Sequence, residues 1–318
     1  MADNRIPIVC VVGPTASGKT SLSVKLAQVF DGEIISADSM QIYKGMDIAT
    51  AKPTKDEMCG IKHHLMDFLD ADKSFSVAQY CELAHEIIRD VHSRGKLPIL
   101  VGGTGLYVDS LLNNITFADS DCNEELRNEL QIKCEESGVD ILLDELREFD
   151  PETADKLSVE KNAKRIIRAI EVYRVTGVTM SEHNRNSRMI ESPYKVAKIG
   201  LTATDRQFLY DRINTRVDVM LKNGLLEEAK EAQKFEFSNT SSMAIGHKEL
   251  MPYFDGVDTL ENCIENLKMQ TRRYAKRQLT WFRRDENINW INIDINDNES
   301  VVQLAVSTIK KVLFNEEN

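Results

Sequence analysis

The chain has 318 residues, the length of one large domain or two of ordinary size, and its 42% hydrophobic and 29% charged residues are typical of a soluble globular protein. No apolar run approaches the roughly 20 residues that a membrane-spanning helix needs, and residues 1–5 lack the basic and apolar regions of a signal peptide. The six cysteines form no CxxC pair, which favours free thiols in a reducing compartment. We therefore expect a cytoplasmic protein with no membrane partner.

The net charge of −11 is unevenly distributed along the chain. Residues 119–160 hold 15 acidic and four basic residues, so the rest of the chain is close to neutral. Two blocks, 161–188 and 268–284, each hold seven Lys or Arg, against two acids in the first and none in the second. Such blocks are usually solvated helix faces. They also suit a polyanion, because the local field rather than the net charge captures it.

A glycine-rich motif lies between a predicted strand, 6–12, and a predicted amphipathic helix, 21–30. In the GxxxxGK[ST] pattern, backbone amides and the helix N-terminus cradle phosphates, the lysine reaches the outer phosphates, and the last hydroxyl holds Mg²⁺. The sequence therefore predicts a diphosphate or triphosphate site, with Thr20 as the magnesium ligand. The predicted phosphate-binding residues are Gly13, Pro14, Thr15, Ala16, Ser17, Gly18, Lys19 and Thr20.

An acidic residue, Asp38, follows the second predicted strand, 33–36. Open α/β sheets place ligands at the carboxyl ends of their strands, so Asp38 is a candidate magnesium ligand or general base. Capping of the next turn is the alternative role. The polar segment 41–53 is predicted to be a functional loop rather than part of the core.

A third predicted strand, 97–101, follows a predicted helix, 75–94, and runs into Gly102-Gly103-Thr104-Gly105. A motor-type P-loop ATPase carries an aspartate at the end of this strand, whereas glycines and a threonine stand here. We expect the Thr104 hydroxyl to face a ligand and the glycines to allow its close approach.

Residues 119–192 show helical periodicity and no strand-like run. We therefore predict an α/β fold: a P-loop NTPase-like core with a parallel sheet, formed by 1–118 and 193–318, and an α-helical insertion domain, 119–192. The predicted helix that begins at Asn162 presents Lys164, Arg165 and Arg168 close to one face.

The second part of the core is predicted to hold a strand, 194–202, and three helices, 205–223, 225–235 and 259–284. Arg212 and Arg216, one turn apart, suit a shared phosphate, although surface arginines at this spacing are common. The last helix interleaves basic residues with Tyr274, Trp281 and Phe282. This pattern suits single-stranded nucleic acid and equally a helix that packs in the core.

Seven segments, in this order, resemble those of the bacterial tRNA dimethylallyltransferase family. They are GPTASGKT (13–20), ADSMQIYKGMDIATAKP (37–53), VGGTGLY (101–107), AKRIIRAIEVYRVTG (163–177), GLLEEAK (224–230), AIGHKEL (244–250) and AKRQLTWFRR (275–284). The resemblance covers nearly the whole chain. It implies that a dimethylallyl group moves from dimethylallyl diphosphate to the exocyclic amino group of the adenine just 3′ of the tRNA anticodon. It also implies that the P-loop takes a prenyl diphosphate rather than hydrolysing ATP. We expect a monomer.

The resemblance also implies roles for individual residues. Asp38 is the general base, Thr104 touches the target nucleotide, and Arg216 joins Lys19 and Mg²⁺ on the leaving diphosphate. Two positions depart from the family pattern, because His247 stands in place of tyrosine and Lys164 in place of glutamine. The implied contacts with the tRNA anticodon arm are Asp38, Ser39, Met40, Gln41, Thr104, Arg127, Lys164, Arg165, Ile166, Ile167, Arg168, Met243, Ala244, Ile245, Gly246, His247 and Lys248.

Two other activities fit parts of the sequence. An enzyme that prenylates free adenine nucleotides would share the P-loop, but it would not need the insertion or the two basic blocks. A P-loop small-molecule kinase would use Lys19 and Asp38 in similar ways, but it would consume ATP without tRNA.

Overall fold

The computed structural model describes residues 4–115, 123–234, 237–238 and 240–316. The chain divides into two compact units. The core unit comprises Met1–Leu112 and Pro193–Asn318, and the helical unit comprises Asn113–Ser192. The division after 112 lies six residues before the boundary expected from the sequence, and the division after 192 coincides with it.

The core unit is built on a six-stranded parallel sheet with the order β3-β2-β4-β1-β5-β6. The central strand β1 pairs with β4 and β5, and it is apolar and buried from Ile8 to Val12 because both faces of the sheet are covered. This topology confirms the predicted α/β class. The strands are β1 (Ile6–Val12), β2 (Gly32–Ser36), β3 (His63–His64), β4 (Leu97–Gly102), β5 (Tyr194–Thr202) and β6 (Asn289–Asn292).

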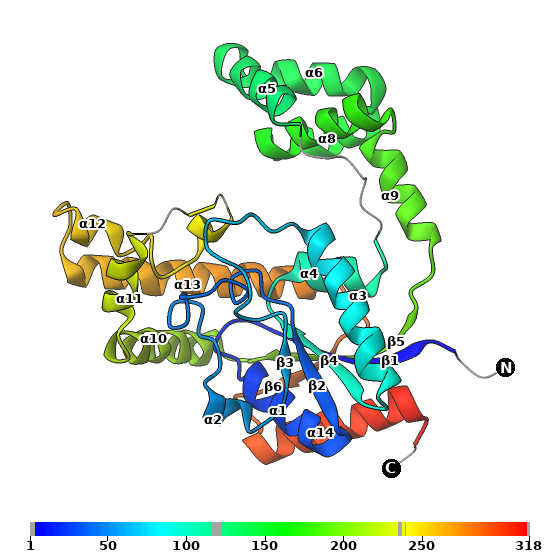
Figure 1. The fold of residues 1–318 in the computed structure, drawn as a ribbon, viewed down its shortest axis with the longest axis vertical. Coiled ribbons are helices and arrows are strands. Elements are labelled where there is room, and N and C mark those ends of the chain that lie inside the picture. Colours follow the sequence, from blue (N-terminus) through cyan, green and yellow to red (C-terminus); the bar gives the residue numbers. More distant parts are fainter. Residues whose placement is uncertain (1–3, 116–122, 235–236, 239, 317–318) are drawn as a thin grey trace. The chain divides into compact units, whose positions relative to one another are not determined.

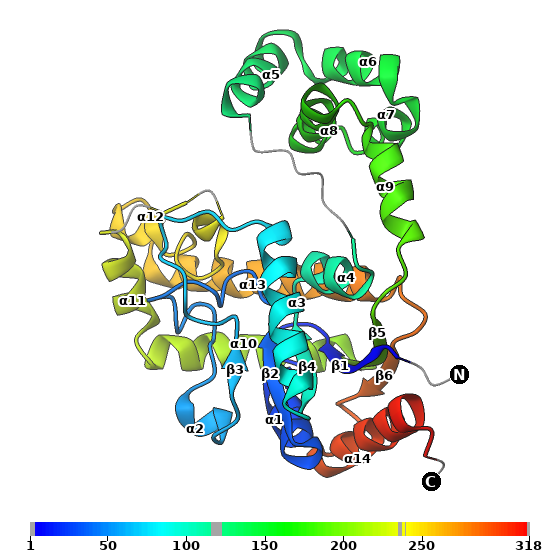
Figure 2. The ribbon, with the colours of Figure 1, turned by 45° about the vertical axis from the view of Figure 1, so that its right-hand side comes forward.

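Helices cover both faces of this sheet (Figures 1 and 2). On one face, α1 and α14 pack against the strands around Val9, Ile99 and Ile199. On the other face lie α3 and α4, and α13 runs beside α4. The helices of this unit are α1 (Lys19–Phe30), α2 (Lys55–Met58), α3 (Val77–Ser93), α4 (Gly105–Leu112), α10 (Arg206–Lys222), α11 (Leu225–Ala232), α12 (Met251–Phe254), α13 (Leu260–Phe282) and α14 (Asn298–Ile309).

The helical unit has a core of its own. Leu142, Leu146, Ile166 and Ile170 are fully buried in one cluster, and the described residues of this unit contain no strand. An independent core explains why the insertion can interrupt the chain between α4 and β5 without disturbing the sheet. Its helices are α5 (Glu124–Ser137), α6 (Val139–Phe149), α7 (Pro151–Ser158), α8 (Ala163–Thr176) and α9 (Met180–Met189).

The structure contains several elements that the sequence does not predict. The strand β6 and the helix α14 complete the sheet edge and one helical layer, and the two-residue strand β3 extends the opposite edge. Within the described residues, no helix is both long and apolar enough to cross a membrane.

Candidate functional site

The P-loop connects β1 to α1 through three residues with positive φ angles. Gly13 has φ 149°, Ala16 has φ 63° and Gly18 has φ 92°. A Cβ atom on Gly13 would lie 2.7 Å from the backbone oxygen of Leu201 on β5, so a side chain would clash there as well as strain the backbone. Gly18 caps α1 without a side-chain hydrogen bond, which leaves the first helix amides for an anion.

Three charged groups share this site. Burial, and then the charge of Arg216, lower the pKa of Lys19 to about 7, while Asp38 opposes the shift. Burial also lowers the pKa of Arg216, and Asp38 again opposes the shift. The Nζ atom of Lys19 donates to the Pro14 oxygen at 2.8 Å. Lys19 and Arg216 are two partly desolvated cations near the single carboxylate of Asp38, so the site favours binding of a further anion.

Asp38 lies in the turn after β2 and caps it. Its Oδ1 accepts from the Met40 amide at 2.9 Å and from the Gln41 amide at 3.4 Å. The Thr104 hydroxyl accepts from the Ser39 amide at 3.0 Å, and the Thr104 amide donates to the Ala37 oxygen at 3.2 Å. The structure therefore joins the Asp38 turn to the Thr104 turn, as parallel strands β2 and β4 end side by side.

The glycines around Thr104 serve the packing of α13. A Cβ atom on Gly103 would lie 2.0 Å from Nε2 of Gln278, and one on Gly105 would lie 2.2 Å from Cδ1 of Trp281. The expectation that these glycines admit a ligand is therefore corrected, since both positions are filled by side chains of α13.

The predicted loop 41–53 and the stretch 243–248 meet at Glu228 on α11. Its carboxylate accepts from the amides of Ile48 at 2.7 Å and Ala49 at 2.9 Å, and it lies 2.9 Å from Nε2 of His247. Although burial acts to raise the pKa of Glu228, the hydrogen bonds from His247 and the two amides lower it overall. Glu228 lies in the segment GLLEEAK (224–230), which carries part of the family resemblance, but the sequence predicts no role for it.

The stretch 243–248 is largely packed inside the core unit. Ala244 and His247 are buried, Ile245 packs against the cluster that contains Ala49 and Leu225, and the Gly246 amide donates to Glu249 at 2.8 Å. The expectation that Ala244, Ile245 and His247 contact tRNA through their side chains is therefore corrected, because these side chains pack inside the core unit. Lys248 is exposed. The backbone of Met243 lies in a short 3₁₀ turn.

In the helical unit, Arg127 and Arg168 converge on Glu171. The Glu171 side chain is fully buried, and it lies 2.8 Å from Nη2 of Arg127 and 3.0 Å from Nη1 of Arg168. Burial opposes ionisation, yet these two guanidinium groups hold the pKa of Glu171 below its usual range. The buried carboxylate thus fixes Arg127 and Arg168, two of the three arginines that the family resemblance implies as tRNA contacts.

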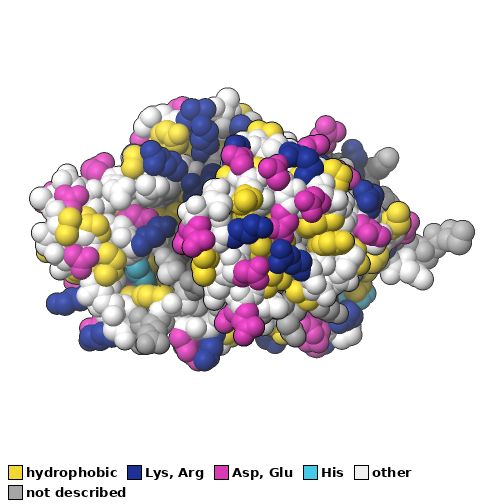
Figure 3. Space-filling model, turned by 90° about the horizontal axis from the view of Figure 1, so that it is seen from above, with side chains coloured by type: hydrophobic (Ala, Val, Ile, Leu, Met, Phe, Trp, Pro, Cys, Tyr) yellow, Lys and Arg dark blue, Asp and Glu magenta, His cyan; other side chains and the backbone are white. Residues whose placement is uncertain are grey.

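The remaining predicted residues of α8 divide by exposure. Lys164 and Arg165 are exposed, and Arg165 pairs with Glu160 at 2.7 Å. Ile166 and Ile167 are buried in the core of the helical unit, which corrects the expectation of an RNA contact by their side chains. On the face shown in Figure 3, basic and acidic side chains are interspersed, so neither sign of charge covers that face.

The three aromatic residues of α13 differ in burial, because Phe282 is buried whereas Tyr274 and Trp281 are partly exposed. Phe282 is 2% exposed, and Trp281 Nε1 donates to Asp109 at 2.7 Å. Burial raises the pKa of Tyr274, and its hydroxyl hydrogen-bonds Thr104 and Gln278. The structure therefore supports a packing role for Phe282. Tyr274 and Trp281 keep part of their surface exposed, and Arg277 and Arg284 lie over their rings at 5.6 and 4.1 Å.

No three His, Cys, Asp or Glu side chains cluster as a metal site within the described residues. The donor set around the P-loop still suits Mg²⁺, which commonly takes one or two protein oxygens together with phosphate oxygens and water. Thr20 stands directly after Lys19 at the start of α1, which is where such an ion would meet a bound diphosphate.

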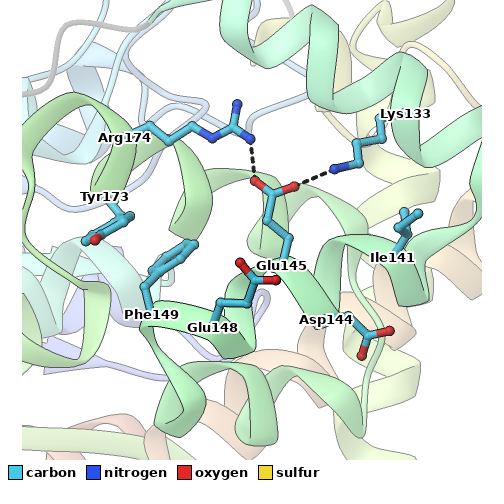
Figure 4. Close-up of a pocket in the computed structure, with 8 residues that line it drawn as sticks. All are labelled: Lys133, Ile141, Asp144, Glu145, Glu148, Phe149, Tyr173 and Arg174. Atoms are coloured by element: carbon cyan, nitrogen blue, oxygen red, sulfur yellow. Dashed lines mark hydrogen bonds and ion pairs between the residues drawn. The ribbon is translucent and has the colours of Figure 1, made fainter.

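A cavity of about 530 Å³ lies in the helical unit (Figure 4). Glu145 bridges Lys133 and Arg174 there, and Phe149 stacks on Tyr173. None of the residues that line it was predicted as a site residue. Because Lys133 and Arg174 both pair with Glu145, this cavity is a poor candidate for an anion-binding site.

A family model described as IPP transferase matches residues 41–285. The tRNA dimethylallyltransferase of Acetivibrio thermocellus is 47% identical over 93% of this chain and 94% of its own length. The crystal structure of the tRNA isopentenylpyrophosphate transferase from Bacillus halodurans is 43% identical, with a TM-score of 0.71 over 96% of this chain and 97% of that one. A eukaryotic dimethylallyltransferase, described in crystallographic snapshots as acting on tRNA, is 29% identical, with a TM-score of 0.85 over 98% of this chain and 80% of that one.

Proposed function

Because the chain belongs to the IPP transferase family, we propose that it transfers a dimethylallyl group from dimethylallyl diphosphate to the exocyclic amine of the adenine 3′ of the tRNA anticodon. The observation that carries this proposal is the grouping of Lys19 and Arg216 with the Asp38 carboxylate. The cations suit a leaving diphosphate, and the carboxylate suits the proton of a weak nucleophile.

The proposed step breaks the bond between the allylic carbon and the diphosphate oxygen and forms a carbon–nitrogen bond to adenine. The departing diphosphate gains negative charge, which the P-loop amides, Lys19 and Arg216 stabilise where it develops. Asp38 accepts the proton that the amine loses. Thr104 touches the target nucleotide. Its hydroxyl accepts a hydrogen bond from the Ser39 amide, which keeps it beside the turn that carries Asp38.

Magnesium has a supporting role in this proposal. Bound at the Thr20 hydroxyl, it would neutralise phosphate charge and so assist departure of the diphosphate. The protein holds the cations and the carboxylate in place, and it presents the helix amides beside them.

The target adenine must leave its stack to reach Asp38 and Thr104. Contacts with the anticodon arm are proposed for exposed basic side chains of the helical unit, Lys164 and Arg165, together with Arg127 and Arg168. The proposed enzyme works as a monomer in the cytoplasm, where its tRNA substrate is found. Light scattering at assay concentration checks the monomeric state.

The experiment supplies purified protein and Mg²⁺ with radiolabelled dimethylallyl diphosphate and either unmodified tRNA with adenine 3′ of the anticodon or free AMP. Asp38→Asn is the informative variant, because an amide oxygen can still cap the Met40 amide while the basic carboxylate is lost. Its rate should fall by about 10²–10⁴. Asp56→Asn, an exposed substitution on α2, is the matched control and should keep full activity.

Three outcomes separate the alternatives. Label in tRNA, lost with Asp38→Asn and kept with Asp56→Asn, supports the proposal. Label in AMP alone would instead identify an enzyme that prenylates free nucleotides. ATP turnover without transfer to either acceptor would indicate a kinase.

A further inference from the structure

Gln278 on α13 lies between the P-loop and the turn that carries Thr104. Its Oε1 accepts from the Thr15 amide at 2.8 Å, and its Nε2 donates to the Gly103 oxygen at 3.1 Å. The side chain is 5% exposed. Since one neighbour is a donor and the other an acceptor, the orientation of the Gln278 amide is determined.

This contact occupies part of the phosphate cradle. A P-loop binds phosphate oxygens through backbone N–H groups, and Thr15 is the third residue of the motif. Its N–H group already has a carbonyl oxygen as its acceptor. A phosphate oxygen aimed at the same N–H group would lose that donor and would meet the partial negative charge of Oε1.

A second side chain holds the P-loop, and a glycine leaves room for Gln278. Nε of Arg212 on α10 donates to the Ala16 oxygen at 2.8 Å. Gly103 has no side chain, and a Cβ atom there would lie 2.0 Å from the Gln278 amide nitrogen. Because Arg212 fixes the residue after Thr15 and Gly103 makes room for the glutamine, the contact is built into the packing of α10 and α13.

We propose that Gln278 is a specificity-determining residue that makes this P-loop select a diphosphate over a triphosphate. The Ser17 amide donates to the Pro14 oxygen at 3.3 Å, and the amides of Ala16, Gly18, Lys19 and Thr20 remain to receive a diphosphate. A third phosphoryl group would be placed against the glutamine oxygen. The inference rests on the proposed function, because it assumes that the P-loop holds the diphosphate of the prenyl donor.

The test measures binding of magnesium pyrophosphate and magnesium tripolyphosphate to the full-length protein by titration calorimetry, without tRNA. The wild type should bind pyrophosphate at least about tenfold more tightly, the effect of one lost hydrogen bond and one unfavourable contact. Gln278→Met removes the acceptor at similar volume and should shift the ratio of the two affinities about tenfold toward tripolyphosphate. Gln270→Met, also on α13 but bonded only to Asn266 among the described residues, should leave the ratio unchanged.

The ratio separates selectivity from structural damage. If Gln278→Met only loosened the P-loop, both affinities would fall together and the ratio would stay constant, which would overturn the inference. Equal affinities in the wild type would overturn it too while leaving the proposed function intact. Failure of the wild type to bind either polyphosphate would count against both. Gln278→Glu, which keeps an acceptor and adds charge, should weaken tripolyphosphate binding more than pyrophosphate binding.

Discussion

The buried His247 pairs with the partly buried Glu228, with 2.9 Å between Nε2 of the histidine and Oε1 of the carboxylate. Nδ1 of His247 is buried and has no hydrogen-bond partner among the described residues. The same carboxylate receives the Ile48 and Ala49 amides. One residue of α11 therefore ties two chain segments that are far apart in the sequence.

Removing this carboxylate should destabilise the core unit. Glu228→Ala leaves a buried imidazole and two amides without their acceptor, which costs about 2–4 kcal/mol of unfolding free energy. Urea denaturation followed by circular dichroism measures the loss. Glu231→Ala, an exposed position on the same helix, should change stability by less than about 0.5 kcal/mol. Equal stability of the two variants would contradict the anchoring role of Glu228.

The affinity for pyrophosphate should depend on the protonation of Lys19. Its pKa is about 7 without ligand, and a bound anion raises it because the charged form is then favoured. The complex therefore takes up a proton above pH 7, and affinity should fall by up to about tenfold per pH unit there. Calorimetry between pH 6 and 9 checks this slope. Lys19→Arg keeps its charge across this range, so an equally steep slope in that variant would assign the effect to another group.

Acid should weaken the fold through Glu33. Hydrogen bonds from Arg94, and secondly from His64, lower its pKa to about 2 despite its burial. A lowered carboxylate pKa stabilises the folded state fully above the unfolded value near 4.5, and this stabilisation disappears as pH falls toward 2. The stability difference between wild type and Glu33→Gln should therefore be large at pH 6 and shrink steadily below pH 4.5. A difference that stayed constant from pH 6 to pH 3 would refute this linkage.

The salt dependence of tRNA binding should show whether Lys164 contacts a phosphate of the tRNA. If this exposed side chain contacts a phosphate, Lys164→Ala should weaken binding and reduce the slope of log affinity against log salt by about 0.7–0.9. Filter binding between 50 and 300 mM salt gives the slope. Lys156→Ala is the control, since Lys156 is exposed on α7 and pairs with Glu152. Identical slopes for both variants would remove Lys164 from the interface.

The sequence by itself determined the local chemistry of this protein. Two glycines, a lysine and a hydroxyl in fixed spacing specify the P-loop, and the apolar run of β1 specifies a buried strand, because both properties depend on neighbouring residues. The change to helical periodicity after residue 119 likewise predicted an α-helical insertion domain.

Only the tertiary structure decided which distant groups meet. Gln278 takes the Thr15 amide, Glu228 joins residue 48 to residue 247, and Glu171 binds Arg127. All three contacts connect segments separated by tens to hundreds of residues. Burial divided the predicted stretch 164–168 into exposed and core positions. A sequence pattern carries no distance between such segments, because their separation is set by how the helices pack on the sheet and on one another.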